Sequence, residues 1–142
     1  MTGYEQDFYS WTQEQAALLK QGRFAELDVN NLIEEVETMG RSEKRELESR
    51  LTVLLLQLLK WKYQAIRRGR SWQLSIDEQR LQFAETLSEN PSLKARLDEL
   101  VIKSYRLAVI QAARETNISK TVFPEDCPWT LAQFLDEGFY PD

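Results

Sequence analysis

The sequence predicts an all-α protein, and three observations support this fold class. Apolar residues recur about every 3.6 positions along almost every segment of the 142-residue chain. No run of alternating β-branched residues is long enough to indicate a strand. The chain has only five Gly and four Pro, as is typical of an ordered, helix-rich protein. We therefore expect one helical domain over residues 1–142: an up-and-down bundle of about five helices, a short C-terminal helix and an irregular strap.

Start and stop signals place two helices in the first third of the chain. Asp7 is suited to cap a helix that runs to about residue 21, and Gly22 stops it. After a linker, Asp28 caps a second helix that runs through residue 39, where Gly40 ends or bends it. The apolar positions of this second helix predict an inward face made of Leu32, Ile33, Val36 and Met39.

Residues 42–68 predict the central helix of the bundle. Ser42 opens it, and its length would be roughly 40 Å at 1.5 Å per residue. Between residues 51 and 59 apolar side chains cover most of its circumference, so several other helices should contact it. Trp61 and Tyr63 continue its apolar stripes, which favours core positions for both rings.

The rest of the chain predicts two more long helices and an irregular end. Ser71 caps the fourth helix, which ends at Asn90 and Pro91, and the same pair starts the fifth. Asn117 then stops the fifth helix at about residue 116. Residues 121–129 predict a turn-rich strap, followed by a short helix of six residues.

Composition excludes several classes of function. The chain has no histidine, so a Ser-His-Asp or Cys-His nucleophile cannot form within it. Its one cysteine, Cys127, precludes an intramolecular disulfide and favours a cytoplasmic setting. We expect no signal peptide, no membrane span and no cofactor, and an enzyme is the less favoured class. Cys127 follows Glu125 and Asp126, which would raise its pKa, so a buried structural thiol is favoured over a nucleophile.

The order of several short motifs resembles a known family. The helix that begins at Asp28 carries Glu34, Glu35 and Gly40, and a leucine run then ends in LLKW. The later motifs are SW at 71–72, QR at 79–80, NPSL at 90–93 and CPW at 127–129. Together they resemble the bacterial family catalogued as domain of unknown function 29, common in cyanobacteria. The resemblance implies an all-helical domain without an established activity, and a family pattern that often has histidine at the position of Gln57.

The first candidate site is acidic. Asp28 and Glu35 share a helix face with Glu34 beside it, and helical carboxylates at such spacing can bind a divalent metal, as in a metal-dependent carboxylate-bundle enzyme. The alternative is structural: Asp28 caps the helix, and the glutamates pair with Arg41, Lys60 or Arg80.

The second candidate site is basic and would bind nucleic acid. Residues 49–72 carry six basic and no acidic side chains, although the whole chain has a net charge of −5, which opposes attraction to nucleic acid. Alternatively, these cations complement the helix dipole or pair with acidic helices. The candidate phosphate contacts are Lys60, Lys62, Arg67, Arg68 and Arg70.

The function that the sequence favours is a non-enzymatic protein-interaction module. Its helices offer ample apolar surface, so we expect a protein partner or a homo-oligomer. Phe134, Phe139 and Tyr140 are candidates for an exposed contact.

Overall fold

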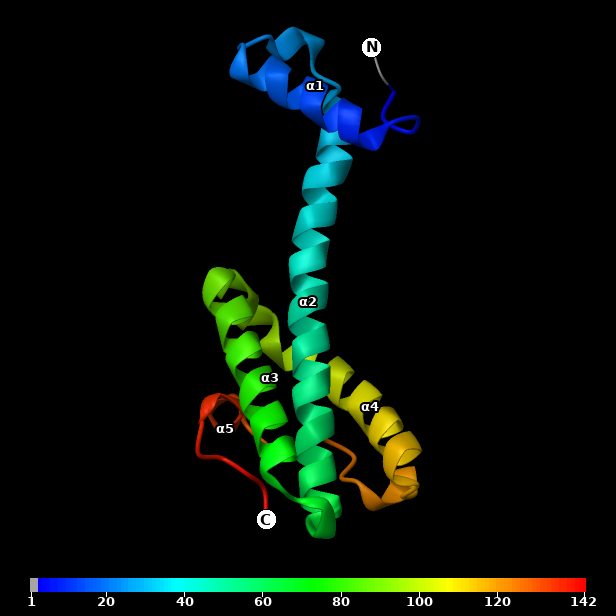
Figure 1. Ribbon diagram of the computed structural model, residues 1–142, viewed down its shortest axis with the longest axis vertical. Helices are drawn as coiled ribbons and strands as arrows, with labels where there is room; N and C mark the ends of the chain where they lie inside the picture. The colour runs from blue at the N-terminus through cyan, green and yellow to red at the C-terminus, as the bar shows by residue number, and fades with distance from the viewer. Residues whose placement is uncertain (1–2) are drawn as a thin grey trace. The chain divides into compact units, whose positions relative to one another are not determined.

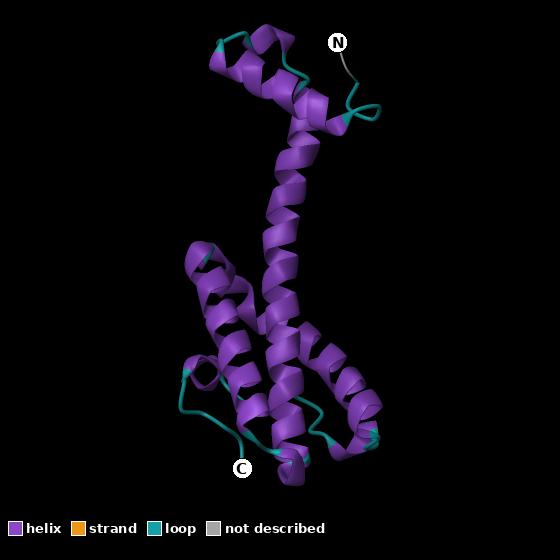
Figure 2. Ribbon diagram, viewed as in Figure 1, coloured by secondary structure: helices purple, strands orange, loops and turns teal. Residues whose placement is uncertain are grey.

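The structure is a computed structural model that describes residues 3–142, and its regular elements are all helices (Figures 1 and 2). The predicted all-α fold class is therefore confirmed. Short 3₁₀ turns lie between the α-helices. Within residues 3–142 the α-helices are α1 (Phe8–Lys20), α2 (Val29–Tyr63), α3 (Arg70–Glu89), α4 (Leu97–Thr116) and α5 (Leu131–Leu135).

The chain divides into two compact units, Met1–Ser42 and Glu43–Asp142. The first unit contains α1 and the first part of α2. The second contains the rest of α2 together with α3, α4 and α5. A single domain over residues 1–142 stays a prediction.

α2 differs from the prediction in both its continuity and its end. It runs for 35 residues without interruption, so the predicted helix boundary at Gly40 and Ser42 is wrong. A glycine inside a helix costs only about 1 kcal/mol relative to alanine, which the hydrogen bonds of the surrounding turns offset. α2 ends at Tyr63 rather than near Arg68, and a 3₁₀ turn at Ala65–Arg67 leads to α3.

The first unit is held together by a small polar cluster. The Asp7 side chain caps α1 by accepting from the backbone N–H of Ser10 at 3.0 Å. One turn further, the indole N–H of Trp11 donates to Asp28 Oδ2 at 2.9 Å, and the Asp28 backbone N–H donates to Gln15 Oε1 at 2.8 Å. Trp11 and Gln15 are both buried. These contacts join α1 to the beginning of α2.

The face of α2 that was predicted to point inward in this unit is largely exposed. Ile33, Val36 and Met39 are 51%, 60% and 61% exposed, and Leu32 is half-buried. The reason is that α1 contacts the side of α2 that carries Asp28. The adjoining side, which carries Val29, Ile33 and Val36, is left uncovered.

In the second unit, α3 and α4 lie on either side of α2 (Figure 1). α3 follows α2 after a short turn and runs back along it. α4 runs in the same direction as α2, as two contacts show. Ser104 Oγ donates to the carbonyl of Glu48 at 3.3 Å, and further along both helices Glu115 lies 3.8 Å from Lys60.

The core of the second unit is apolar and fully enclosed. α2 contributes six leucines that are 0% exposed, which confirms that this stretch is the centre of the bundle. Trp61 and Tyr63 pack against this core as partly buried side chains. The core comprises Leu47, Leu51, Leu54, Leu55, Leu58, Leu59, Ile76, Phe83, Leu87, Leu97, Leu100, Tyr105, Ala108, Val109, Ala112, Phe123, Trp129 and Phe134.

Arg80 of α3 holds the C-terminal segment against the bundle. Its side chain is only 3% exposed, and its guanidinium donates to the carbonyls of Phe134 at 2.6 Å, Glu137 at 3.4 Å and Phe139 at 2.8 Å. The expected pairing of Arg80 with glutamates of α2 is therefore wrong. Phe134 is 0% exposed and Phe139 and Tyr140 are half-buried, so the proposed exposed contact near the C-terminus is also wrong for Phe134.

Candidate functional site

The three carboxylates proposed as metal ligands have separate partners. Asp28 accepts hydrogen bonds from Asn31 and Trp11, and these bonds lower its pKa. Glu35 accepts a hydrogen bond from the hydroxyl of Tyr4, which raises the pKa of that tyrosine to about 12. Glu34 lies 3.5 Å from Arg41, which also pairs with Glu37 at 3.7 Å.

These contacts agree with the structural interpretation of the acidic candidate site. Asp28 joins α1 to the beginning of α2 through its hydrogen bond with Trp11. Glu34 and Glu37 pair with Arg41, and pairing of the glutamates with Arg41 was part of the structural alternative. Within residues 3–142, no group of three or more His, Cys, Asp or Glu side chains is arranged to hold a metal ion.

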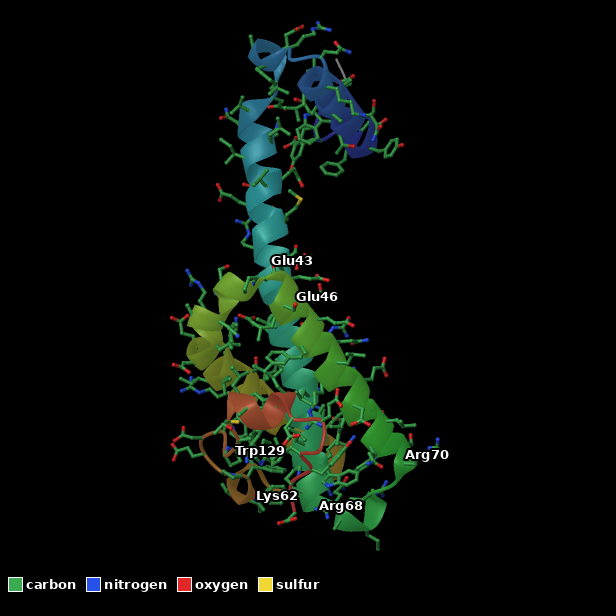
Figure 3. All side chains as sticks on the ribbon, turned by 90° about the vertical axis from the view of Figure 1, so that its left-hand side faces the viewer. Glu43, Glu46, Lys62, Arg68, Arg70 and Trp129 are labelled. Atoms are coloured by element: carbon green, nitrogen blue, oxygen red, sulfur yellow. The ribbon has the colours of Figure 1, made fainter. Side chains whose placement is uncertain are left out.

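The basic candidates lie at the end of the second unit where α2 passes into α3. Figure 3 shows Lys62, Arg68 and Arg70 there, with Glu43 and Glu46 near the other end of the unit. Arg67 and Arg70 are exposed. Lys62 is half-buried, with its ammonium 5.8 Å from the centre of the Tyr63 ring.

Arg68 has a structural role that the sequence did not reveal. Its guanidinium donates to the carbonyl of Trp61 at 2.7 Å and to that of Pro141 at 3.3 Å, and it lies over the Trp61 ring. Arg68 thus satisfies one of the carbonyls left free at the end of α2. It is less available to a phosphate than Arg67 and Arg70.

Lys60 lines a pocket of about 230 Å³ between α2 and α3. Its ammonium lies 5.1 Å from the centre of the Trp72 ring, and its side chain is 24% exposed. The pocket is lined by Gln57, Lys60, Ser71, Trp72 and Ser75.

Gln57, the position at which the chain departs from the family pattern, has an unsatisfied side-chain oxygen. Its Oε1 is buried and has no hydrogen-bond donor. Gln57 and Lys60 thus meet at one pocket. Glu35, one of the proposed metal ligands, belongs to the first unit, where it accepts a hydrogen bond from Tyr4.

The thiol of Cys127 is half-buried, with Sγ 3.6 Å from the carbonyl oxygen of Trp129. Burial raises its pKa. We expect a thiol reagent at neutral pH to label the folded protein at least about tenfold more slowly than the urea-unfolded chain, because little thiolate forms below the raised pKa. The labelling rate should increase as the pH rises through that pKa. Equal rates for folded and unfolded chains would contradict a structural thiol.

The exposed apolar face of α2 in the first unit is a second candidate site. Val29, Ile33 and Val36 are separated by four and three residues, a spacing typical of helix–helix contacts, and each is more than half exposed. Met39 borders them. We call these four residues the α2 stripe. The sequence showed its periodicity, but it could not show that the stripe is left uncovered.

The helices described between residues 3 and 142 include none that is both long enough and apolar enough to span a membrane.

Comparison with known proteins identifies a family. No curated protein and no solved structure matches the chain. A family model with the description "Domain of unknown function DUF29" matches residues 3–140, which is nearly the whole chain and includes both units. The protein therefore belongs to the DUF29 family.

Proposed function

We propose that the protein is a helical protein-interaction module and that the α2 stripe is its contact surface. The occupant we propose is an amphipathic helix of a partner protein, with an apolar face flanked by Lys and Arg. The observation that carries the proposal is the exposure of Val29, Ile33, Val36 and Met39 along one side of α2.

The distribution of exposed apolar side chains supports this location. Sixteen large hydrophobic side chains are exposed among residues 3–142, and eight of them lie in residues 3–42, less than a third of the described chain. In the same segment Trp11 and Gln15 are the fully buried residues. A unit that buries so little apolar surface gains little stability by itself, and a bound helix would cover the stripe.

Charge supports a basic partner over a second copy of the chain. Residues 3–42 carry three basic and eight acidic side chains, a net charge of −5. Glu34 and Glu37 are both exposed on α2, 3.5 and 3.7 Å from Arg41. Two such acidic units would repel each other, whereas flanking Lys and Arg residues would be attracted.

The test uses synthetic amphipathic helical peptides that share a Leu stripe and differ in having Lys or Glu on their flanks. We expect the Lys-flanked peptide to bind, as measured by fluorescence anisotropy. Ile33→Glu with Val36→Glu should weaken this binding at least about tenfold, because it places charge on the buried side of the contact. The loss should occur although the double variant has two more negative charges.

Asn30→Glu with Thr38→Glu is the matched control, since both residues are exposed on the same part of α2 and outside the stripe. It adds the same charge and should retain binding. Equal loss in both double variants would contradict the stripe as the contact. If sedimentation instead finds dimers that Ile33→Glu with Val36→Glu dissociates, the occupant is a second copy and the basic partner is wrong.

Two other predictions stand beside this proposal. Nucleic-acid binding is one of them: the exposed cations Arg67 and Arg70 favour it, and the net charge of −5 opposes it. A bacterial cytoplasm is the proposed setting, on the grounds of the family resemblance and the single cysteine.

A further inference from the structure

The turn between α2 and α3 carries the most exposed large hydrophobic side chain among residues 3–142. Ile66 lies in the 3₁₀ turn Ala65–Arg67 and is 97% exposed. Because α2 ends at Tyr63, Ile66 does not continue the apolar stripe of that helix into the core. An aliphatic side chain gains free energy when it leaves water. At this exposure, almost none of that gain is realised within the chain.

Hydrogen bonds fix the turn that presents Ile66. The backbone N–H of Arg67 donates to the carbonyl of Gln64 at 2.9 Å, and the Arg68 guanidinium donates to the carbonyl of Trp61 at 2.7 Å. The first bond closes the turn, and the second ties it to the end of α2. A partner that contacts Ile66 therefore does not have to order a loose loop, which would weaken binding.

Cations flank Ile66 along the chain. Arg67 and Arg70 are exposed, and Lys62 is half-buried at the end of α2. Figure 3 shows Lys62 and Arg70 at this end of the second unit. Within residues 3–142, none of these three side chains belongs to an ion pair. Residues 49–76 include no Asp or Glu, so the three charges are available to an anionic partner.

Two acidic residues also lie near this end. Glu115 is 3.8 Å from Lys60, and Asp142 follows Pro141, whose carbonyl accepts from Arg68 at 3.3 Å. The whole chain has a net charge of −5. At physiological salt, however, interactions between exposed charges are screened beyond about 8 Å. The charges next to a bound surface therefore count for more than the net charge.

We propose that the second unit binds the surface of an anionic lipid bilayer through Lys62, Ile66, Arg67 and Arg70, which we call the basic tip. Ile66 enters the boundary between the headgroups and the acyl chains, and the three cations lie at the level of the lipid phosphates. The basic tip belongs to the second unit and the α2 stripe to the first. Binding to a bilayer therefore does not depend on the protein contact proposed above.

The exposure of Ile66 favours a bilayer over other anionic partners. A fluid surface closes around an isolated apolar side chain, whereas a folded protein would need a matching cavity. Nucleic acid also attracts cations, but an aliphatic side chain inserted between bases must first unstack them. Each contribution is weak by itself, so we expect reversible binding that requires both Ile66 and the cations.

Sedimentation of the full chain with lipid vesicles tests the proposal. The vesicles contain phosphatidylcholine alone or with about 40% phosphatidylglycerol, at about 5 mM lipid and about 0.05 M NaCl. We expect partitioning onto the anionic vesicles to be at least about tenfold stronger than onto the neutral ones, and about 0.5 M NaCl should release the protein. No binding to anionic vesicles, or equal binding to both kinds, would overturn the proposal.

Ile66→Ser tests the apolar contact. It should weaken binding to the anionic vesicles at least about fivefold, because serine gains little by leaving water. The matched control is Leu81→Ser on α3, where Leu81 is 58% exposed. It should retain binding, and both variants should fold because both side chains are exposed. Unchanged binding of Ile66→Ser, or equal loss in the two variants, would rule out insertion of Ile66.

Arg67→Gln with Arg70→Gln tests the charges and should weaken binding at least about tenfold. Lys94→Gln with Arg96→Gln removes the same charge from exposed residues and should retain binding. These controls lie near the other end of the unit, since Asn90 just before them donates to Glu43 at 3.0 Å. Equal loss in the two double variants would contradict the basic tip. A short oligonucleotide that displaces the vesicles, and whose own binding is unaffected by Ile66→Ser, would assign the cations to nucleic acid instead.

Discussion

Replacing Arg80 with methionine is expected to lower the free energy of unfolding by about 3 kcal/mol, measured by urea denaturation. Arg80 is 3% exposed, and its three guanidinium nitrogens donate to carbonyls of Phe134, Glu137 and Phe139. Methionine fills similar space but donates to none of them. The carbonyls must then lose their partners or move to water, and movement would expose the apolar side chain of Phe134.

The destabilisation caused by Arg80→Met should be greatest in the C-terminal segment. Hydrogen exchange in residues 134–142 should accelerate more than exchange in α2, because the lost contacts hold the C-terminal segment. Arg80→Lys should recover only part of the stability, since an ammonium cannot reproduce the planar fork that reaches three carbonyls. Arg106→Met, at an exposed arginine of α4, is the control and should change stability by less than about 0.5 kcal/mol. A change below about 1 kcal/mol for Arg80→Met would contradict this role.

Replacing Leu58 with alanine is expected to cost about 3 kcal/mol of unfolding free energy. Leu58 is 0% exposed in the core of the second unit, and α3 and α4 flank the helix that carries it. The substitution removes apolar surface from the core and leaves a cavity that helices on two sides cannot easily close.

Leu81→Ala is the matched control, because Leu81 of α3 is 58% exposed. The same chemical change there should cost less than about 1 kcal/mol. The slope of the urea transition should be unaffected in both variants if only native stability changes. Comparable losses at the two positions would mean that Leu58 does not occupy a close-packed core.

Local signals predicted much of the helical structure. Asp7 caps α1, Asn117 ends α4 with a left-handed backbone, and the leucine-rich part of α2 forms the core. Each of these outcomes depends on neighbours within a few residues in the chain or on a regular apolar period. The predicted helix boundary at Gly40 was wrong, because the low helix propensity of one glycine is too weak to interrupt an otherwise continuous helix.

The candidate sites were less predictable, because their properties depend on distant segments. The sequence marks Lys60 as a candidate phosphate contact and Gln57 as a departure from the family pattern, yet the pocket that they share requires Ser71 and Trp72 of α3. In the sequence, the basic residues between Lys60 and Arg70 are equivalent candidates for phosphate contacts. In the structure, the guanidinium of Arg68 donates hydrogen bonds to two backbone carbonyls, whereas Arg70 is exposed.

By itself, the sequence determined the fold class, the approximate helices, the apolar spine of α2 and the family, because periodicity and short motifs are local properties. Only the tertiary structure decided which faces are covered. Ile33 and Val36 have the same apolar pattern as a core face but remain exposed, while the charged Arg80 is buried. The physical reason is that burial depends on which other segment packs against a residue. For Arg80, that segment begins 54 residues later in the chain.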